Sequence, residues 1–369
     1  MSTNDNAIKI SWYKVPVPRK TLQSLHQRSD GKGFLQAGGF LGLLALTGTA
    51  AWLTQDRLYL FLPILFLHGT FWTFLGPGRH ELVHNSVFQS KLLNAIFLRL
   101  YCFLSWDSHV MYWASHFRHH KYTLHPPDDL EVELPYDLSL KSFLKTGFVD
   151  VGMFYKTLKG AIRLSLGKDE GTIPKQRSTN PNKAYPLESE WHMRLFPREN
   201  VEERHRLFNW ARVLLIGHTS IVAVAIYFGL WALPLIVSFA GFYGGWLKYL
   251  CVVPQHAGLQ DAVPDFRLCC RTIILNPFLR FLYFQMNYHT EHHMYPAVPC
   301  YNLAKLHRLI KHQMPDCPRG LWATWRQLLS IRKKQLAEPG YQYVPELPTD
   351  DATTAGEHAE REPVLLSAE

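Results

Sequence analysis

Uncharged apolar stretches alternate with polar segments along the chain. Asp, Glu, Lys and Arg are all missing from residues 33–55, 58–78 and 213–247. A helix needs about 20 apolar residues to cross the hydrocarbon core of a bilayer. The first two stretches therefore each predict one membrane span, at 33–55 and 58–78. The third is long enough for two spans, 213–230 and 231–247, which turn near Gly229 to Pro234.

Basic residues flank these spans and predict their orientation. They precede the first span, and Arg79 and Lys248 directly follow the two predicted hairpins. Basic residues next to a span favour the cytosolic side of the membrane. We therefore predict an all-α integral membrane protein with four transmembrane helices in two hairpins and a helical cap on the cytosolic face.

The rest of the chain divides around these spans. Residues 1–32 form a basic cytosolic N-terminal segment, and residues 33–336 form the membrane domain with its cap. Residues 167–204 are rich in Lys, Pro, Asn, Ser and Glu and predict a mobile cytosolic loop. Pro, acidic residues, Thr and Ala dominate residues 337–369, which predicts a disordered C-terminal tail.

Three shorter apolar segments belong to the predicted cap. Residues 92–106 contain Asn94 and Arg99, so they predict a helix that lies in the interface or under the cap, with a re-entrant segment as the alternative. Residues 273–288 predict an interfacial helix. Its aromatic side chains could line a substrate tunnel or pack in the core. Residues 302–314 predict an amphipathic helix that rests on lipid headgroups.

Composition narrows the class of protein. The chain has 369 residues, of which 47% are hydrophobic and 19% charged, with a net charge of +9. No Arg/Lys-rich nucleic-acid motif accompanies the positive charge, so we assign it to the cytoplasmic side of a membrane protein. The six Cys residues form no C-x-x-C pair, which indicates reduced, structural thiols.

Histidines form three local clusters. The first box is His-Glu-Leu-Val-His at residues 80–84, the second is His-Phe-Arg-His-His at 116–120, and the third is His-Thr-Glu-His-His at 289–293. Side chains at positions i, i+3 and i+4 of a helix lie on one face. Eight neutral imidazoles gathered in this way are good metal donors. Because one ion takes four to six ligands, eight donors predict a shared centre with two ions.

The ligand type limits the choice of metal. Imidazole suits Zn, Cu, Fe and Ni. Structural zinc sites normally have four ligands, often including Cys, so an all-histidine set of this size argues against them. A pair of redox-active irons that binds dioxygen fits better, because removal of hydrogen from an unactivated C–H bond needs a cofactor.

The order and spacing of the three boxes resemble the membrane fatty acid desaturases and their hydroxylase relatives, over roughly residues 60–310. The resemblance implies a di-iron centre on the cytosolic face that uses O2 and external electrons. It also implies that the metal ligands are His80, His84, His116, His119, His120, His289, His292 and His293. The family places a further ligand between the last hairpin and the third box, where His256 is the candidate.

Other polar residues near the boxes are candidates for support. Glu81, Asp107 and Glu291 could accept the free N–H of a metal-bound imidazole, although ordinary helix charges are an equal interpretation. His109, His125, Asp128 and Asp129 could contact the ligands or lie at the surface. Arg118 could pair with a carboxylate or point away. His68, inside the second predicted span, is interpreted as packed, hydrogen-bonded or substrate-lining rather than as a ligand.

We therefore predict an oxidoreductase that desaturates or hydroxylates a lipid or lipophilic metabolite, such as an acyl chain, a polyketide or a terpenoid. No fused haem-binding stretch occurs, so electrons would come from a separate donor, a cytochrome b5 or a ferredoxin with its reductase. The membrane would be the endoplasmic reticulum in a eukaryote or the inner membrane in a bacterium. The alternative is a zinc-dependent membrane hydrolase or a non-catalytic metal-binding membrane protein.

Overall fold

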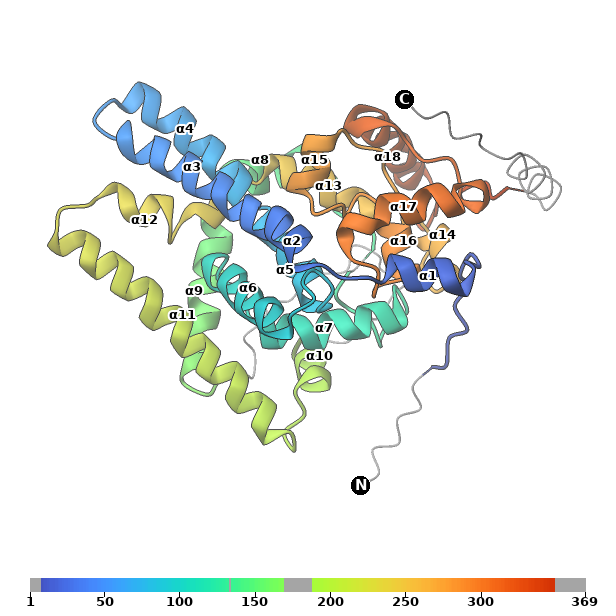
Figure 1. The fold of residues 1–369 in the computed structure, drawn as a ribbon, viewed down its shortest axis with the longest axis horizontal. Helices are drawn as coiled ribbons and strands as arrows, with labels where there is room; N and C mark the ends of the chain where they lie inside the picture. Colours follow the sequence, from blue (N-terminus) through green and yellow to red (C-terminus); the bar gives the residue numbers. More distant parts are fainter. Residues whose placement is uncertain (1–7, 133, 169–187, 349–369) are drawn as a thin grey trace.

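Helices form all of the regular secondary structure in the residues that the structure describes (Figure 1). The structure is a computed structural model, and it describes residues 8–132, 134–168 and 188–348, with the side chains of 188–190 left out. Half of the predicted loop at 167–204, residues 169–187, and the end of the predicted tail lie outside these residues. The loop prediction is wrong for much of the described remainder, because Glu188–Leu195 is helical and another helix begins at Val201.

The predicted first hairpin is present. Helix α2 (Asp30–Gly33), a π-helical turn (Phe34–Gly38) and α3 (Gly39–Leu53) form one continuous rod that packs against α4 (Leu58–Trp72). A two-residue break separates α4 from α5 (Leu75–Val83), which carries the first box. Asp30–Leu53 and Leu58–Val83 are long and apolar enough to cross a membrane. The first two predicted spans are therefore confirmed as helices of that length.

The second predicted hairpin differs from the sequence prediction. Its first arm is the long helix α11 (Val201–Tyr227), which is the third helix able to cross a membrane. Gly229 turns the chain with a φ of +69°, as the sequence predicted near this position. The following residues do not form a fourth long helix. They form α12 (Ala232–Ile236), a short 3₁₀ turn and the start of α13 (Trp246–Val252). Gly244 adopts a φ of +73°, which prevents the helix α13 from extending back towards α12.

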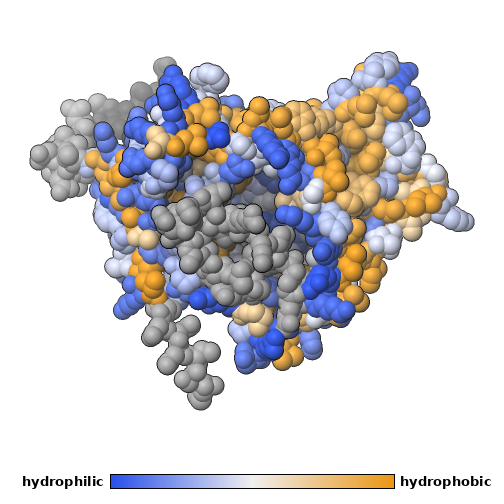
Figure 2. Space-filling model, turned by 180° about the vertical axis from the view of Figure 1, so that it is seen from behind, coloured by the Kyte–Doolittle hydropathy of each residue, from blue (hydrophilic) through white to orange (hydrophobic). Residues whose placement is uncertain are grey.

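Apolar surface gathers on the side of the molecule that these helices form. Figure 2 shows hydrophobic residues concentrated over the hairpin and α11, whereas hydrophilic residues dominate the opposite end. Leu53 at the hairpin tip and Ile226 near the end of α11 are each 76% exposed. Exposed apolar surface of this extent is expected where lipid covers the protein.

Most of the remaining helices lie away from the tip of the hairpin, in the part of the molecule called the cap here, whereas α9 (Val151–Ser165) packs along α11. Two of them carry the second and third boxes, namely α7 (His109–Tyr122) and α16 (His289–Met294). The cap also contains α1 (Arg19–Leu25), α8 (Leu140–Gly147), α10 (Glu188–Leu195), α14 (Phe266–Cys269), α17 (Cys300–Ile310) and α18 (Gly320–Ala337). The amphipathic helix predicted at residues 302–314 corresponds to α17.

The predicted interface segments have different outcomes. Residues 92–106 form α6 (Lys91–Leu104), which packs on α5 and leaves Leu92 and Ile96 exposed. It is not among the described helices long enough to cross a membrane. The helix predicted at 273–288 is wrong for most of its length, because only α15 (Pro277–Leu282) is helical. Asn276 caps this helix and Pro277 starts it, while Phe284 has a positive φ of 51° that ends it.

The aromatic residues of that segment divide between core and surface, because Phe281 is partly buried and Phe278 is 53% exposed. Tyr283 and Phe284 are buried in the main apolar cluster with residues of α3, α4 and α6. A Cβ atom on Gly78 would overlap the Tyr101 ring and lie 2.9 Å from Phe284. Glycine at this position therefore lets α5 approach α6 closely, two residues before the first box.

Both chain ends of the described part pack against the cap. Trp12 stacks on Phe266 with ring centroids 4.2 Å apart, and α1 contacts α17. The Tyr343 backbone N–H donates to the Gly258 carbonyl at 2.8 Å, and Pro345 is buried. Residues 341–348, assigned to the tail by their composition, thus lie against folded chain. All six Cys residues are free thiols, as predicted.

Candidate metal centre

The three boxes and His256 come together as two groups of imidazoles. The first group contains His80, His84, His116, His120 and His292, and the second contains His119, His256, His289 and His293. Within each group the candidate ligand nitrogens all lie within 4.8 Å of one another. The structure therefore places all nine predicted ligand residues in one region.

Helices α7 and α16 each contribute to both groups. On α7, His116 and His120 belong to the first group and His119 to the second. On α16 the assignment is reversed, because His292 belongs to the first group and His289 and His293 to the second. In each case the i and i+4 residues share a group and the i+3 residue belongs to the other.

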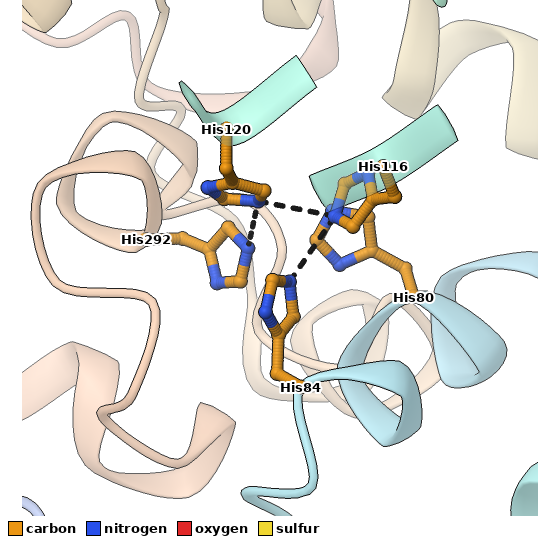
Figure 3. A group of neighbouring side chains, drawn as sticks. All are labelled: His80, His84, His116, His120 and His292. Carbon is orange, nitrogen blue, oxygen red and sulfur yellow. Dashed lines mark hydrogen bonds between the residues drawn. The ribbon is translucent and has the colours of Figure 1, made fainter. Parts of the chain in front are cut away.

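The first group is drawn in Figure 3. Its imidazoles face one another through Nε2 atoms. The Nε2 of His116 lies 3.1 Å from that of His84 and 3.0 Å from that of His120, and the Nε2 of His292 lies 3.2 Å from that of His120. His80 completes the group, with its ring centroid 4.2 Å from that of His116.

The imidazoles of the second group also face one another through Nε2 atoms. The Nε2 of His289 lies 2.9 Å from that of His256 and 3.1 Å from that of His293. The loop after α13 supplies His256. The two groups are neighbours, because the rings of His120 and His293 stack with centroids 4.4 Å apart.

Several imidazoles are anchored from behind through Nδ1. His116 Nδ1 lies 2.8 Å from Glu131 Oε1, and His119 Nδ1 lies 2.8 Å from Asp129 Oδ2. The carbonyl oxygen of Cys269 lies 2.8 Å from His256 Nδ1. Such contacts fix the ring orientation and direct Nε2 towards the centre of the group.

The three carboxylates named from the sequence have different positions. Glu81 is fully buried, and its Oε1 lies 3.2 Å from His80 Nδ1 and 3.3 Å from His292 Nδ1. Asp107 contacts no box histidine among the described residues and instead pairs with Arg79. Glu291 points away from both imidazole groups. Its Oε1 lies 2.5 Å from Nδ1 of His307, which belongs to neither group, and its Oε2 lies 2.5 Å from Thr272 Oγ1. The prediction of a supporting contact is therefore met in geometry by Glu81 but not by Asp107 or Glu291.

Glu131 was not found by sequence reasoning, and Asp129 was only one of several candidates. Both follow α7, 15 residues after His116 and 10 residues after His119 respectively. An acidic residue 10 to 15 positions after a histidine is only weak evidence for a contact between the two. The conformation of the intervening loop decides whether the carboxylate folds back onto the imidazole. Arg118 pairs with Asp128 at 3.7 Å, which holds its side chain away from the imidazoles.

Burial makes most of these imidazoles neutral donors. It lowers the pKa of His84 to about 4 and that of His256 to about 3, with the nearby His119 adding to both shifts. The pKa values of His116, His120, His289, His292 and His293 are lowered well below the usual value for the same first reason. His119 is different. Burial lowers its pKa, but the Asp129 and Glu131 carboxylates together raise it by more, so the net shift is upward.

A stack of side chains covers His116 on the outer side. The Tyr112 ring lies on the His116 ring with centroids 4.9 Å apart, and the Arg79 guanidinium lies 3.8 Å from the Tyr112 centroid. A cavity of about 420 Å³ adjoins the same group and is bordered by His84, His116 and His120. Trp113 and Phe117 stand exposed at its edge.

His68 does not join either group, in agreement with its interpretation as a packed, hydrogen-bonded residue. Its Nδ1 lies 2.8 Å from Thr47 Oγ1, and its Nε2 lies 2.9 Å from the Ile236 carbonyl oxygen. It therefore connects α4 to α3 and α12. Beside it, a cavity of about 360 Å³ opens between these helices and is lined mainly by apolar side chains.

The imidazole geometry fits metal ions. Imidazole nitrogens bind metals of this size at about 2.0–2.1 Å, so two nitrogens at right angles around one ion lie about 3.0 Å apart. The observed Nε2 separations of 2.9–3.2 Å have this length. The His80 Nε2 is buried and has no hydrogen-bond partner among the described residues. The donor set of both groups suits a metal that accepts neutral nitrogen ligands.

A family model described as fatty acid desaturase matches residues 57–325 of the chain. The matched region contains all three boxes, His256, Asp129 and Glu131. A search of curated proteins found no match.

Proposed function

Since the chain belongs to the fatty acid desaturase family, we propose that it is a membrane-bound di-iron enzyme that desaturates or hydroxylates an unactivated C–H site. Family membership makes it an oxidoreductase whose relatives act on lipids in membranes. The observation that carries the finer proposal is the arrangement of nine buried or half-buried imidazoles as two adjoining groups. The proposed substrate is a lipid or lipophilic metabolite, such as an acyl chain, a polyketide or a terpenoid.

The first group, with five imidazoles, would hold one iron ion, and the second, with four, would hold the other. Two bound irons would supply dioxygen activation and the two-electron oxidation that no side chain can perform alone. The absence of Cys from both groups supports a redox role over structural zinc.

The chain's own residues would keep this centre in shape. Glu81, Asp129 and Glu131 accept or face the outer N–H of four imidazoles, so their carboxylates fix the tautomer and offset positive charge. Glu131 also accepts a hydrogen bond from the Ser115 hydroxyl at 2.7 Å, which orients the carboxylate itself. The burial of the second group excludes bulk water from its surroundings.

The apolar cavity between α3, α4 and α12 supports a lipophilic substrate. It reaches Trp72, eight residues before His80, and its wall includes Leu44 and Ile236. Desaturation and hydroxylation begin with removal of the same hydrogen. The bound position of the substrate relative to the imidazole groups would therefore decide the product.

Electrons would arrive from a separate protein, a cytochrome b5 or a ferredoxin with its reductase. We place the boxes on the cytosolic face, because basic residues flank the first hairpin on that side. The membrane would be the endoplasmic reticulum in a eukaryote or the inner membrane in a bacterium.

The test combines product mass with metal analysis. Cells that express the chain in air are compared with cells that express His119→Ala or His292→Ala. A product 16 mass units heavier than the substrate indicates hydroxylation, and one 2 mass units lighter indicates desaturation. We expect two irons per chain in the unmodified protein. Neither variant should form product. Stoichiometric zinc and turnover that is indifferent to oxygen would instead favour a zinc hydrolase or a non-catalytic metal protein.

A further inference from the structure

A polar pocket borders the third box at Thr290. Its volume is about 590 Å³. Its walls come from residues 270–272, Thr290, the loop at 314–318, α18 and the segment 343–346. Figure 1 places α18 at the opposite end of the molecule from the tip of the α3–α4 hairpin. The pocket therefore belongs to the cap.

Arg271 is a buried cation in the wall of this pocket. It is only 6% exposed. Its Nη1 donates to the carbonyl oxygens of Pro254 and Ala257, but its Nη2 has no hydrogen-bond partner among the described residues. No carboxylate of the described chain pairs with it within 4.0 Å. A buried charge without a counter-ion is costly, and the two neutral carbonyls do not compensate it.

Two further polar groups of the same pocket are also unsatisfied. Thr290 is 1% exposed, and its Oγ1 lacks a hydrogen-bond partner in the described part of the chain. The same holds for Gln327 Oε1 on α18. Buried polar atoms are normally paired. Three unpaired atoms on residues that line one pocket therefore point to a ligand that supplies their partners.

The rim differs from the deep wall. Arg326, Asp316 and Glu346 are exposed there, and none of them forms an ion pair with another described residue within 4.0 Å. The deep wall is thus cationic, whereas the rim presents charges of both signs. A polyanion would meet the two rim carboxylates, so a single anionic group with a polar or cationic remainder matches the pocket better.

We propose that this pocket binds a small soluble molecule with one carboxylate or phosphate group, which pairs with Arg271 and Thr290. The rest of the molecule faces Gln327 and the mixed charges of the rim. Water alone could complete the hydrogen bonds but could not neutralise the guanidinium. One water occupies about 30 Å³ of liquid, so the pocket is also much larger than a single water needs.

This binding site goes beyond the proposed oxidation chemistry and uses different side chains. It nevertheless shares a wall with the metal centre, because Thr290 follows His289 directly and Arg271 donates to the backbone on both sides of His256. A bound ligand would therefore contact the two chain segments that hold the second imidazole group.

Calorimetric titration of the purified protein in detergent tests the proposal. The probes are inorganic phosphate, O-phosphoethanolamine and β-alanine, with ethanolamine as the cation-only control. We expect saturable 1:1 binding of O-phosphoethanolamine or β-alanine and none of ethanolamine. The probe that binds tells whether the anion is a phosphate or a carboxylate. Failure of all three anionic probes to saturate would overturn the proposal.

Variants place the binding in this pocket. We expect Arg271→Gln to weaken binding at least about tenfold, which corresponds to about 1.4 kcal/mol. Because Arg271 also supports the backbone, Thr290→Val and Arg326→Gln provide independent tests in which severalfold weaker binding is expected. Arg308→Gln, an exposed change on α17 outside the pocket, is the matched control. Unchanged binding in Thr290→Val and Arg326→Gln, or an equal loss in the control, refutes the site. Iron content of the same samples reports separately on the proposed function.

Discussion

Replacing Asp129 with asparagine removes one buried negative charge from behind His119 while it keeps the size of the side chain. The carboxylate is 1% exposed and accepts three hydrogen bonds. They come from His119 Nδ1 at 2.8 Å, from the Leu124 N–H at 2.8 Å and from the Glu131 N–H at 2.9 Å. The bonds from His119 and Leu124 share one oxygen. An asparagine with its oxygen in that position keeps neutral versions of these two bonds and turns its NH2 group towards the Glu131 N–H.

The expected loss follows from these contacts. A hydrogen bond to a charged group contributes about 1.5–3 kcal/mol, so the variant should lose a comparable amount of unfolding free energy. Removal of a partner behind a metal-bound histidine typically weakens metal binding by about 10–100-fold. When Asp129→Asn is dialysed against graded chelator, iron in the second group should therefore be lost at a lower chelator concentration than in the unmodified protein, and turnover should fall with it.

Asp128→Asn is the matched control for this experiment. The neighbouring Asp128 pairs with Arg118 at 3.7 Å and with Arg194 at 3.2 Å, and it contacts no box histidine. Partly exposed ion pairs of this kind contribute about 0–1 kcal/mol. We expect Asp128→Asn to retain its iron and its turnover. If both variants held iron equally well, the supporting role of Asp129 would be refuted.

Three further changes follow from the same geometry. Glu81→Gln should selectively weaken iron binding by the first group, because Glu81 faces two of its imidazoles. Metal analysis should then find about one iron per chain instead of two, and an unchanged iron content contradicts the prediction. Gly78→Ala should lower the unfolding temperature, since its new methyl group would overlap Tyr101. The control is Gly76→Ala on the same helix, whose methyl group would have no neighbour within 4 Å and which should be neutral or stabilising. Equal unfolding temperatures for the two alanine variants would contradict the proposed close packing. Removal of iron by chelation should stop oxygen uptake, and only added iron should restore it.

The parts of the fold set by local pattern could be predicted from the sequence. The first hairpin follows from two long uncharged stretches, and both were located within a few residues of their observed bounds. The eight imidazoles of the boxes could be recognised as candidate ligands because helix periodicity places i, i+3 and i+4 residues on one face. His256 needed the resemblance to a family, because a single histidine in a loop carries no periodic signal.

Other parts depended on contacts that a one-dimensional pattern does not contain. The segment at residues 231–247 is as apolar as a span, yet it forms short helical turns, and the positive φ of Gly244 separates the last of them from α13. Apolar residues 273–288 pack as irregular chain around α15, because Asn276 and Pro277 start a helix that ends within two turns. Whether an apolar residue faces lipid or a protein core is decided by neighbours far away in the sequence.

The division of the imidazoles between the two groups was also beyond sequence reasoning. On both α7 and α16 the i and i+4 residues belong to one group and the i+3 residue to the other, and the two helices make this assignment in opposite senses. Local spacing fixes which side chains share a helix face. Only the packing of the two helices decides which of them share an ion.

Charge balance explains why buried carboxylates must accompany an all-histidine donor set. Neutral imidazoles contribute no negative charge, so two divalent ions would bring four positive charges into a region where Coulomb interactions are poorly screened. Glu81, Asp129 and Glu131 stand directly behind these imidazoles and offset most of that charge without occupying a coordination position. The first group is backed by two of these carboxylates and the second by one. We therefore expect the two groups to differ in metal affinity, with the second group the first to lose its ion.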